Sequence, residues 1–429
     1  MLRAAKRPSN RRVRDETIVP MSLSRRHWLL SSSAAALPAA PTPAGARIVT
    51  LTSGPKHHFF GYYGVSPWNR AGDKIMCLET QFQNRMPRPN EPALIVAVNP
   101  ESGARKPIVE TRAWNLQQGC MLNWSPSDPG TILYNDADGG DIISVAHTHA
   151  TNKRRIYNRA IESLAPNGRL ASCVTYGRLA RLRPVVGYAS AQDPNPDSNH
   201  PENDGVHILD LETGRSRLAV SLHQVYEALA PRHPEIQNTP LFIQHSVINP
   251  SSDRMFFLAR TRAGGGLTSA MFTAGLDGSG LREVVPYGRG VSHFAWRGPD
   301  EIMATFKVEN KIRHVLFRDI LRPEYQVIGP EFLDADGHCS FSPDAQRIVT
   351  DRNLPDVPAK RLMLYHLGRR EGTVLGEFPM KTPAGENYIS TDLRCDLHPR
   401  WKATGDQVCF DALDTRTWTR QLHIARLSA

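Results

Sequence analysis

Seven segments of the chain share one pattern, in which a short polar turn is followed by a run of apolar residues. The turns begin at Ser66, Ser125, Ala165, Asn249, Arg297, Ser342 and Lys402. Most are rich in Ser, Pro, Asp and Gly, which favour tight hairpins between half-buried strands. Further turns follow in several units, at Ala97, Leu209, Ala274 and Tyr365. Each unit is therefore expected to hold four strands.

A recurring unit of about 40 to 60 residues with four short strands is typical of β-propeller blades, including WD40-like repeats. Residues 47–429 give 429 − 46 = 383 positions, which is about 55 for each of seven blades. The last unit, from Asp396, shows only three strands, and we expect residues 47–52 to supply the fourth and close the ring. The predicted fold class is all-β, a seven-bladed β-propeller of four-stranded antiparallel blades over residues 47–429.

Residues 1–46 differ from the rest of the chain. Arg25 and Arg26 precede an apolar run and an Ala-rich stretch, the order found in twin-arginine export signals. The run is too short and too weakly apolar for a membrane span. The alternative interpretation is a disordered basic tail, and Met21 offers a second start that would exclude residues 1–20. We expect a periplasmic or secreted protein.

The export segment carries most of the positive charge. The whole chain has a formal net charge of +10, but without residues 1–46 the balance is (52 − 8) − (42 − 2) = +4. A mildly basic protein can attract an acidic polysaccharide. No basic helix or aromatic-studded motif is present, so nucleic acid is not an expected partner.

Four histidines occupy the same position in successive units, five residues before the second residue of the turn. They are His245, His293, His338 and His398. The first strand of each blade lines the central channel, so these imidazoles are expected to ring its mouth. Grouped imidazoles can hold a divalent metal, and a single one can act as a base. The competing interpretation is structural, with each histidine bonding backbone and closing the channel.

Other candidate residues precede the turns of the first two blades. Blade 1 carries the run HHFFGYYG, in which His57 is a candidate substrate-binding residue and His58 and Tyr63 are candidates for proton transfer. Blade 2 carries Gln118 at the corresponding place. Alternatively, the aromatic residues in this run serve only in packing.

A basic stretch with two tyrosines lies between the third turn and a loop rich in Pro, Asn and Asp, residues 188–205. It contains Arg181, Arg183 and Tyr188. Arginine is suited to clamping a carboxylate or sulfate. The alternative is a solvated basic strand edge. Six scattered cysteines are expected to be small core residues, although Cys339 and Cys395 lie near the ring histidines and could ligate a metal.

Four motifs carry a resemblance to a known family. They are HHFFGYYG, QQGCMLNWSP, DGHCSFSPDAQRIVTD and DLHPRWKATGDQVCFDA. With them the chain resembles the seven-bladed propeller polysaccharide lyases of the oligogalacturonate lyase type, and more loosely the ulvan lyases. The resemblance implies β-elimination at a uronic acid, in which cationic groups or a divalent metal neutralise the carboxylate and a base removes the C5 proton.

The resemblance also implies site residues. A manganese-type ion, Mn or Ca, would fall on the four ring histidines with Gln118 as a polar partner. The His-x-His pair of oligogalacturonate lyases is not matched, because Cys339 follows His338 and Pro399 follows His398. Likeness to ulvan lyases implies catalytic roles for another set, namely His58, Tyr63, Arg183 and Tyr188. His58 and His245 both remain candidates for the base.

Two functions are open from the sequence. The first is an exported polysaccharide lyase that cleaves an acidic, uronate-containing oligo- or polysaccharide. The second is a non-catalytic, TolB-like periplasmic propeller that binds a protein or glycan, with the histidines as structural plugs. Convergence of the candidate residues on one pocket favours the enzyme, and a filled channel favours the binding protein.

Overall fold

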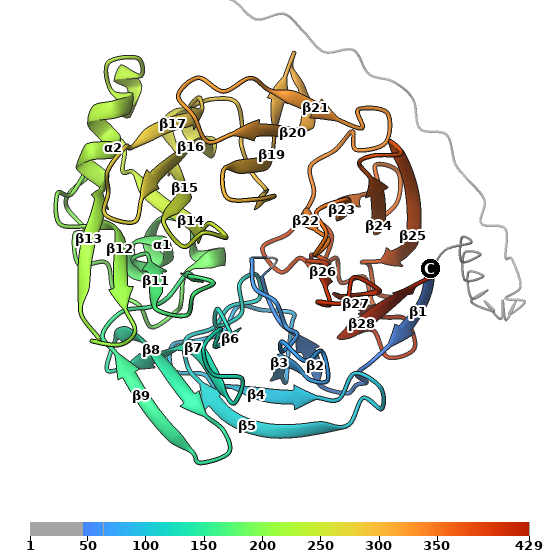
Figure 1. Ribbon diagram of the computed structural model, residues 1–429. Coiled ribbons are helices and arrows are strands. Elements are labelled where there is room, and N and C mark those ends of the chain that lie inside the picture. Colours follow the sequence, from blue (N-terminus) through green and yellow to red (C-terminus); the bar gives the residue numbers. More distant parts are fainter. Residues whose placement is uncertain (1–45, 63, 429) are drawn as a thin grey trace, which may run out of the picture. The chain divides into compact units, whose positions relative to one another are not determined.

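The chain forms a ring of seven four-stranded antiparallel sheets, which confirms the predicted β-propeller (Figure 1). The computed structural model describes residues 46–62 and 64–428. Tyr63 and the export signal predicted within residues 1–46, apart from Ala46, lie outside the described residues. Outer strands such as β5 (Arg105–Thr111), β9 (Lys153–Tyr157) and β25 (Glu371–Pro379) lie at the rim of the ring.

The first three blades follow one another along the chain. Blade 1 consists of β2 (His57–Phe59), β3 (Ile75–Thr80), β4 (Ala93–Val98) and β5. Blade 2 consists of β6 (Asn123–Trp124), β7 (Thr131–Asp138), β8 (Asp141–Thr148) and β9. Blade 3 consists of β10 (Ser163–Leu164), β11 (Leu170–Cys173), β12 (Gly205–Asp210) and β13 (Ser216–Ser221).

The next three blades have the same strand order. Blade 4 consists of β14 (Phe242–Ile248), β15 (Arg254–Thr261), β16 (Thr268–Gly275) and β17 (Arg282–Val285). Blade 5 consists of β18 (Phe294–Trp296), β19 (Glu301–Val308), β20 (Lys311–Arg318) and β21 (Gln326–Ile328). Blade 6 consists of β22 (Ser340–Phe341), β23 (Arg347–Asn353), β24 (Ala359–His366) and β25.

The seventh blade closes the ring with strands from both ends of the described chain. Its strands are β26 (Arg400–Trp401), β27 (Gln407–Asp414), β28 (Thr419–Leu427) and β1 (Ala46–Thr50). Ala46 pairs with Leu427 and Thr50 with His423, so β1 covers the outer edge of β28. The predicted closing strand is thereby confirmed, over Ala46–Thr50 rather than residues 47–52.

The predicted turns join the first and second strands of every blade. In blade 4 the side chain of Asn249 holds the turn, because its Oδ1 accepts the backbone N–H groups of Asp253 and Arg254. Asn69 makes the equivalent pair of bonds in blade 1. In that turn Gly72 has a φ of 71°, and a Cβ there would meet the side chain of Lys402.

Helices occur in the insertions around blade 3. The basic stretch before Tyr188 forms α1 (Tyr176–Leu182) and a 3-10 turn, η1 (Pro184–Val186), rather than a strand edge. The buried Arg178 of α1 donates to the carbonyls of Leu241, Ser198 and Asn199, which fixes the loop predicted at 188–205.

The remaining helical elements are short. They are α2 (Leu222–Leu229), η2 (Pro234–Ile236) and η3 (Ala263–Gly265). A capping box of Ser221 and Gln224 starts α2. None of the helices in the described part of the chain has the length and apolar character needed to cross a membrane.

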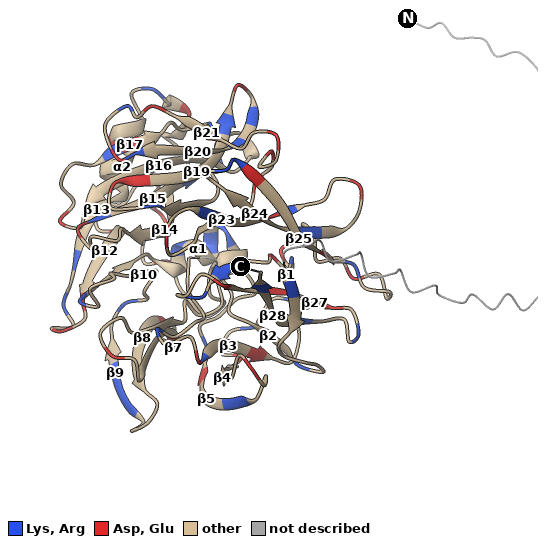
Figure 2. Ribbon diagram, turned by 45° about the vertical axis from the view of Figure 1, so that its right-hand side comes forward, with Lys and Arg blue, Asp and Glu red and all other residues tan. Residues whose placement is uncertain are grey.

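The core lies within and between the blades. All six cysteines are buried and free, as predicted for small core residues. Basic and acidic residues are interspersed along the strands and loops of the ring (Figure 2).

Candidate functional site

One pocket at the centre of the ring brings the four ring histidines together. Its lining includes six residues singled out in the sequence, namely Gln118, Arg183, His245, His293, His338 and His398. The lining also includes five residues that were not predicted from the sequence, namely Tyr62, Gln244, Arg260, Arg394 and Asp396. The space is about 40 Å³, which suits an ion with a few water molecules and is too small for a sugar ring.

Backbone conformation helps to aim two of these histidines. His245 lies where the pairing of β14 with β15 shifts register, and its φ is 64°. His398 precedes β26 with a φ of 45°. Such left-handed backbone is uncommon outside glycine and persists where the surrounding structure enforces it, frequently at binding sites. A bulge in a strand re-aims the side chain that it carries.

Tyr62 and His245 form the closest polar pair in the pocket. The phenol oxygen of Tyr62 lies 2.5 Å from Nδ1 of His245, and the two rings stack with centroids 5.0 Å apart. Burial, followed by the charges of Arg260 and Arg183, lowers the pKa of His245 well below its usual value. The imidazole of His245 is therefore neutral at neutral pH.

A chain of hydrogen bonds assigns the tautomer of His245. Arg260 donates to Oε1 of Gln244 at 2.7 Å, so the Nε2 group of Gln244 faces Nε2 of His245, 2.7 Å away. Because the amide Nε2 can only donate, Nε2 of the neutral His245 accepts, and the ring proton sits on Nδ1. His245 then donates to Tyr62, and a bond donated to a phenol oxygen stabilises negative charge on it.

Three arginines make the pocket attractive to anions. Burial, followed by repulsion from Arg260 and Arg394, lowers the pKa of Arg183 to about 8. The Nη1 atom of Arg183 is buried and makes no hydrogen bond to any described residue. A guanidinium in this situation gains most from a carboxylate, which supplies both charge and acceptors.

His338, Asp396 and His398 form a cluster whose ligand atoms all lie within 4.8 Å of one another. Asp351 and Asp396 outweigh burial and raise the pKa of His338. Although burial opposes it, Lys360 and Arg394 lower the pKa of Asp396 well below its usual value. Asp396 contacts those two cations at 2.7 and 2.8 Å, so they already compensate its negative charge.

This cluster fits a divalent ion by its donor set. The two imidazoles suit zinc and related transition metals, and the carboxylate suits manganese. The buried Oε1 of Gln118, which also lines the pocket, has no hydrogen-bond partner among the described residues and can serve as a further oxygen ligand. Of the predicted metal residues, His338 and His398 belong to the cluster. His245 bonds Tyr62, and His293 bonds Asp336 at 2.7 Å.

Two histidines predicted for the site lie away from the pocket lining. His58 is fully buried, with Nδ1 2.8 Å from Oε1 of Gln421 and Nε2 3.1 Å from Glu79. His57 accepts the backbone N–H of Arg420, and burial, followed by the charge of that arginine, lowers the pKa of His57 to about 4.

Two further predicted residues also lie outside the lining. Tyr188 is buried in the core, where its ring stacks on Tyr176 and its hydroxyl accepts from Asn135. Arg181 lies on α1 and pairs with Asp193 at 2.7 Å. Tyr63 lies outside the described residues.

Some of the missed residues had a signal in the sequence. Tyr62 stands five residues before Pro67, the same offset as the ring histidines. The motif Asp-x-His occurs twice, at Asp336 and at Asp396, and marks two acidic partners of the ring. Arg260 had no such signal, because it reaches the pocket from a second strand, β15, through strand register.

Comparison with known proteins supports the fold. No protein-family profile and no curated protein sequence matches the chain. An oligogalacturonate lyase in complex with manganese is similar in structure, with a TM-score of 0.62 and 14% identity over 91% of this chain and 95% of that chain. An oligogalacturonate lyase from Vibrio parahaemolyticus gives a TM-score of 0.59 and 14% identity over 89% and 93% of the two chains.

TolB from Acinetobacter baumannii is a more distant match, with a TM-score of 0.39 and 12% identity over 72% of this chain and 65% of that chain. A likeness at that level carries no argument about function. At 14% identity the lyase structures also show the fold alone. The chain is a seven-bladed β-propeller that resembles the oligogalacturonate lyase structures over nearly the whole of its described length.

Proposed function

We propose that the protein is an exported polysaccharide lyase that cleaves a uronate-containing glycan by β-elimination. One observation carries the proposal: a neutral histidine bonded to a tyrosine shares a pocket with a guanidinium that lacks an acceptor. β-Elimination needs both parts, one for the proton and one for the carboxylate. Export is also a proposal, because the predicted signal lies outside the described residues and rests on the sequence alone.

The arginines supply carboxylate recognition. Removal of the C5 proton places negative charge on the carbon beside the carboxylate and on its oxygens. Arg183, with Arg260 and Arg394 on the same lining, holds positive charge where that charge develops. Preorganised charge of this kind is usually the largest contribution to such a reaction.

Tyr62 and His245 supply proton transfer. Tyr62 receives a bond from His245 and lies on the same lining as Arg183, so its oxygen can take the C5 proton as a phenolate or return a proton to the departing oxygen at C4. His245 keeps the phenol oriented through its stacked ring. The electron pair of the C5–H bond becomes the C4–C5 double bond as the C4–O bond breaks.

His338, Asp396 and His398 would hold a divalent ion, with manganese as the ion to test first. Calcium, the other predicted ion, prefers six to eight oxygen ligands and fits two imidazoles less well. An ion bound there would add positive charge toward the substrate carboxylate. Asp396 links this cluster to Arg394 through the 2.8 Å ion pair. The residues for carboxylate recognition and for ion binding are thus joined in one network.

The size of the pocket sets how a substrate can bind. About 40 Å³ admits a carboxylate but not its sugar ring, so the ring must lie outside at the mouth. The same observation favours the second candidate, a non-catalytic propeller whose histidines plug the channel. The two candidates differ in one outcome, namely whether an unsaturated uronate forms.

The test is an activity panel with purified protein. Polygalacturonate, ulvan, alginate and glycosaminoglycan oligomers are each incubated with and without manganese or calcium, and products are read by ultraviolet absorbance and mass. The proposal expects one polymer to give oligomers that carry the conjugated double bond. Products enlarged by one water would indicate hydrolysis, and binding without any product would favour the non-catalytic propeller.

A further inference from the structure

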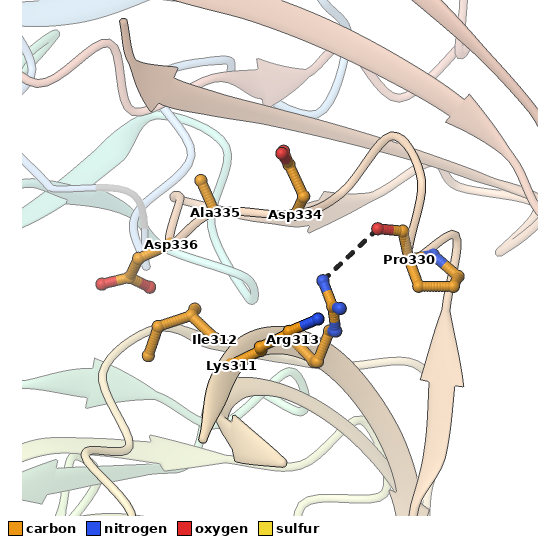
Figure 3. A pocket seen from close by; sticks show the side chains of 7 residues that line it. All are labelled: Lys311, Ile312, Arg313, Pro330, Asp334, Ala335 and Asp336. Atoms are coloured by element: carbon orange, nitrogen blue, oxygen red, sulfur yellow. Dashed lines mark hydrogen bonds between the residues drawn. The ribbon is translucent and has the colours of Figure 1, made fainter. Parts of the chain in front are cut away.

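A second and larger hollow lies beside the central pocket, between blades 5 and 6 (Figure 3). Its volume is about 660 Å³, within the range of pockets that hold small-molecule ligands. One wall is the start of β20, and the other is the segment that leads from blade 5 to blade 6. We name it the blade 5/6 groove, and its lining residues are Lys311, Ile312, Arg313, Pro330, Asp334, Ala335 and Asp336.

The charged residues at the groove carry a net positive charge, which favours the binding of anions. Asp334 is paired with Arg352, and Asp336 is hydrogen-bonded to His293 at 2.7 Å. Three cations, Lys311, Arg313 and Arg352, thus face two carboxylates. Lys311 and Arg313, by contrast, make no ion pair with any described residue. Arg313 donates only to the carbonyl of Pro330, at 3.4 Å, a long bond that a carboxylate would readily replace (Figure 3).

The groove also offers an apolar surface. Ile312 and Ala335 line it and are both partly exposed. Aliphatic side chains of this kind can pack against the C–H face of a sugar ring. Cations beside a small apolar surface suit a uronate residue better than a free inorganic anion, which would gain nothing from Ile312.

One side chain connects the groove to the central pocket. Asp336 lines the groove, and the histidine that it bonds, His293, lines the central pocket. A polyuronate such as polygalacturonate or alginate carries a carboxylate on every residue. If the two residues that flank the cleaved bond lie at the central pocket, the next residue of the same glycan can extend over Asp336 into the groove.

We propose that the blade 5/6 groove is a subsite for a third uronate residue of the substrate, next to the two that flank the cleaved bond, held through its carboxylate by Lys311 and Arg313. The inference rests on the proposed function and extends it to the length of the substrate. The protein then selects oligomers of more than two residues, and the groove contributes to binding rather than to the chemical step.

The experiment compares KM and kcat for a dimer and a tetramer of the cleaved polymer, di- and tetragalacturonate in the first instance. Lys311→Ala combined with Arg313→Ala is expected to raise KM for the tetramer about tenfold, because two charge-assisted contacts are lost. KM for the dimer and kcat for both lengths should stay within about twofold, since the chemical groups are untouched.

The matched control is Lys153→Ala combined with Arg154→Ala on β9, an outer strand with blue segments in Figure 2. It removes the same charge from exposed positions of another blade. Circular dichroism and the single variant Lys311→Gln exclude a folding defect as the cause of any change.

The outcomes separate the subsite from the function. If wild-type protein cleaves both lengths and the groove variant keeps the same ratio of KM values, the subsite is wrong and the lyase stands. An equal effect of the β9 control would show that KM depends only on the net charge of the protein, which would also overturn the subsite. If wild-type protein neither binds nor cleaves a uronate oligomer of either length, both proposals fall.

Discussion

The phenol oxygen of Tyr62 and Nδ1 of His245 are 2.5 Å apart, although the residues are 183 positions apart in the chain and belong to different blades. We expect Tyr62→Phe to lower kcat for uronate cleavage by about 10² to 10⁴, the range of a positioned acid or base. The measurement is the initial rate of unsaturated product, with substrate binding followed separately. A Tyr62→Phe variant with wild-type kcat would show that the phenol transfers no proton.

Gln244→Glu tests the tautomer of His245. The carboxylate keeps the shape of the amide and still accepts from Arg260, but it offers no N–H to Nε2 of His245. The ring proton is expected to move to Nε2, and kcat to fall about tenfold to a hundredfold with little change in KM.

Nitrogen chemical shifts of the labelled His245 ring report the tautomer directly. His207→Leu, at a buried site on β12 that is not part of the pocket lining, is the control for a general effect of core substitution. An unchanged pattern of ring shifts in Gln244→Glu would refute the assigned hydrogen-bond chain.

Removing one member of the ion cluster should separate it from the other ring histidines. His398→Ala is expected to weaken manganese binding by more than about a hundredfold, because a direct ligand matters more than its supporting partners. His293→Ala, which lies outside the cluster, is the matched control and should weaken it much less. Titration calorimetry with the metal alone measures both, and equal losses would assign the ion to the whole histidine ring.

Blade 7 contains a fully buried ion pair. Arg420 and Asp411 are both fully buried and lie 2.8 Å apart. Burial, with partial relief from Arg420, raises the pKa of Asp411 to about 6. Arg420→Met should lower the free energy of unfolding by about 3 to 5 kcal/mol, since it leaves the buried carboxylate of Asp411 without its partner. Adding Asp411→Asn should recover part of that loss in denaturant unfolding, and no recovery would mean that packing of Arg420 on Phe59 dominates.

Buried histidines should make the fold sensitive to acid. Burial is the largest cause that lowers the pKa of His207 to about 4, from an unfolded value near 6.5. Between these values the unfolded chain binds more protons, so stability is full above pH 6.5 and is lost as the pH falls toward 4. Each such group changes the free energy of unfolding by up to about 1.4 kcal/mol per pH unit. His207→Leu should flatten the profile measured in denaturant, and an unchanged slope would exclude this histidine as a source.

The fold was predictable because its turns are local. A Ser, Asn or Gly at a turn reports hairpin geometry within a few residues, and the same turn recurs in each of seven blades. The closing strand was predictable because an open edge on β28 requires a partner. Helix α1 was missed because its arginines suggested a strand edge, whereas Arg178 is used to fix a loop.

The site residues were predictable only where they recur at the same position in successive blades. The four histidines converge because equal offsets from equivalent turns place them at equivalent points of the ring. Tyr62 shares that offset, yet the offset was applied only to the histidines, and the neighbouring Tyr63 was predicted instead. His58 and Tyr188 were chosen on chemistry alone, and the structure places both outside the pocket lining. Lys360 joins the network from β24, so only the strand pairing reveals it.

The central claim is tested most directly by the rate of unsaturated uronate formation in wild-type protein and in His245→Ala, on the polymer selected by the panel and with saturating manganese. The account predicts a rise in ultraviolet absorbance with wild-type protein and its loss in the variant, which should still bind the oligomer. A flat trace for wild-type protein on every uronate polymer, or an equal rate in His245→Ala, would contradict it.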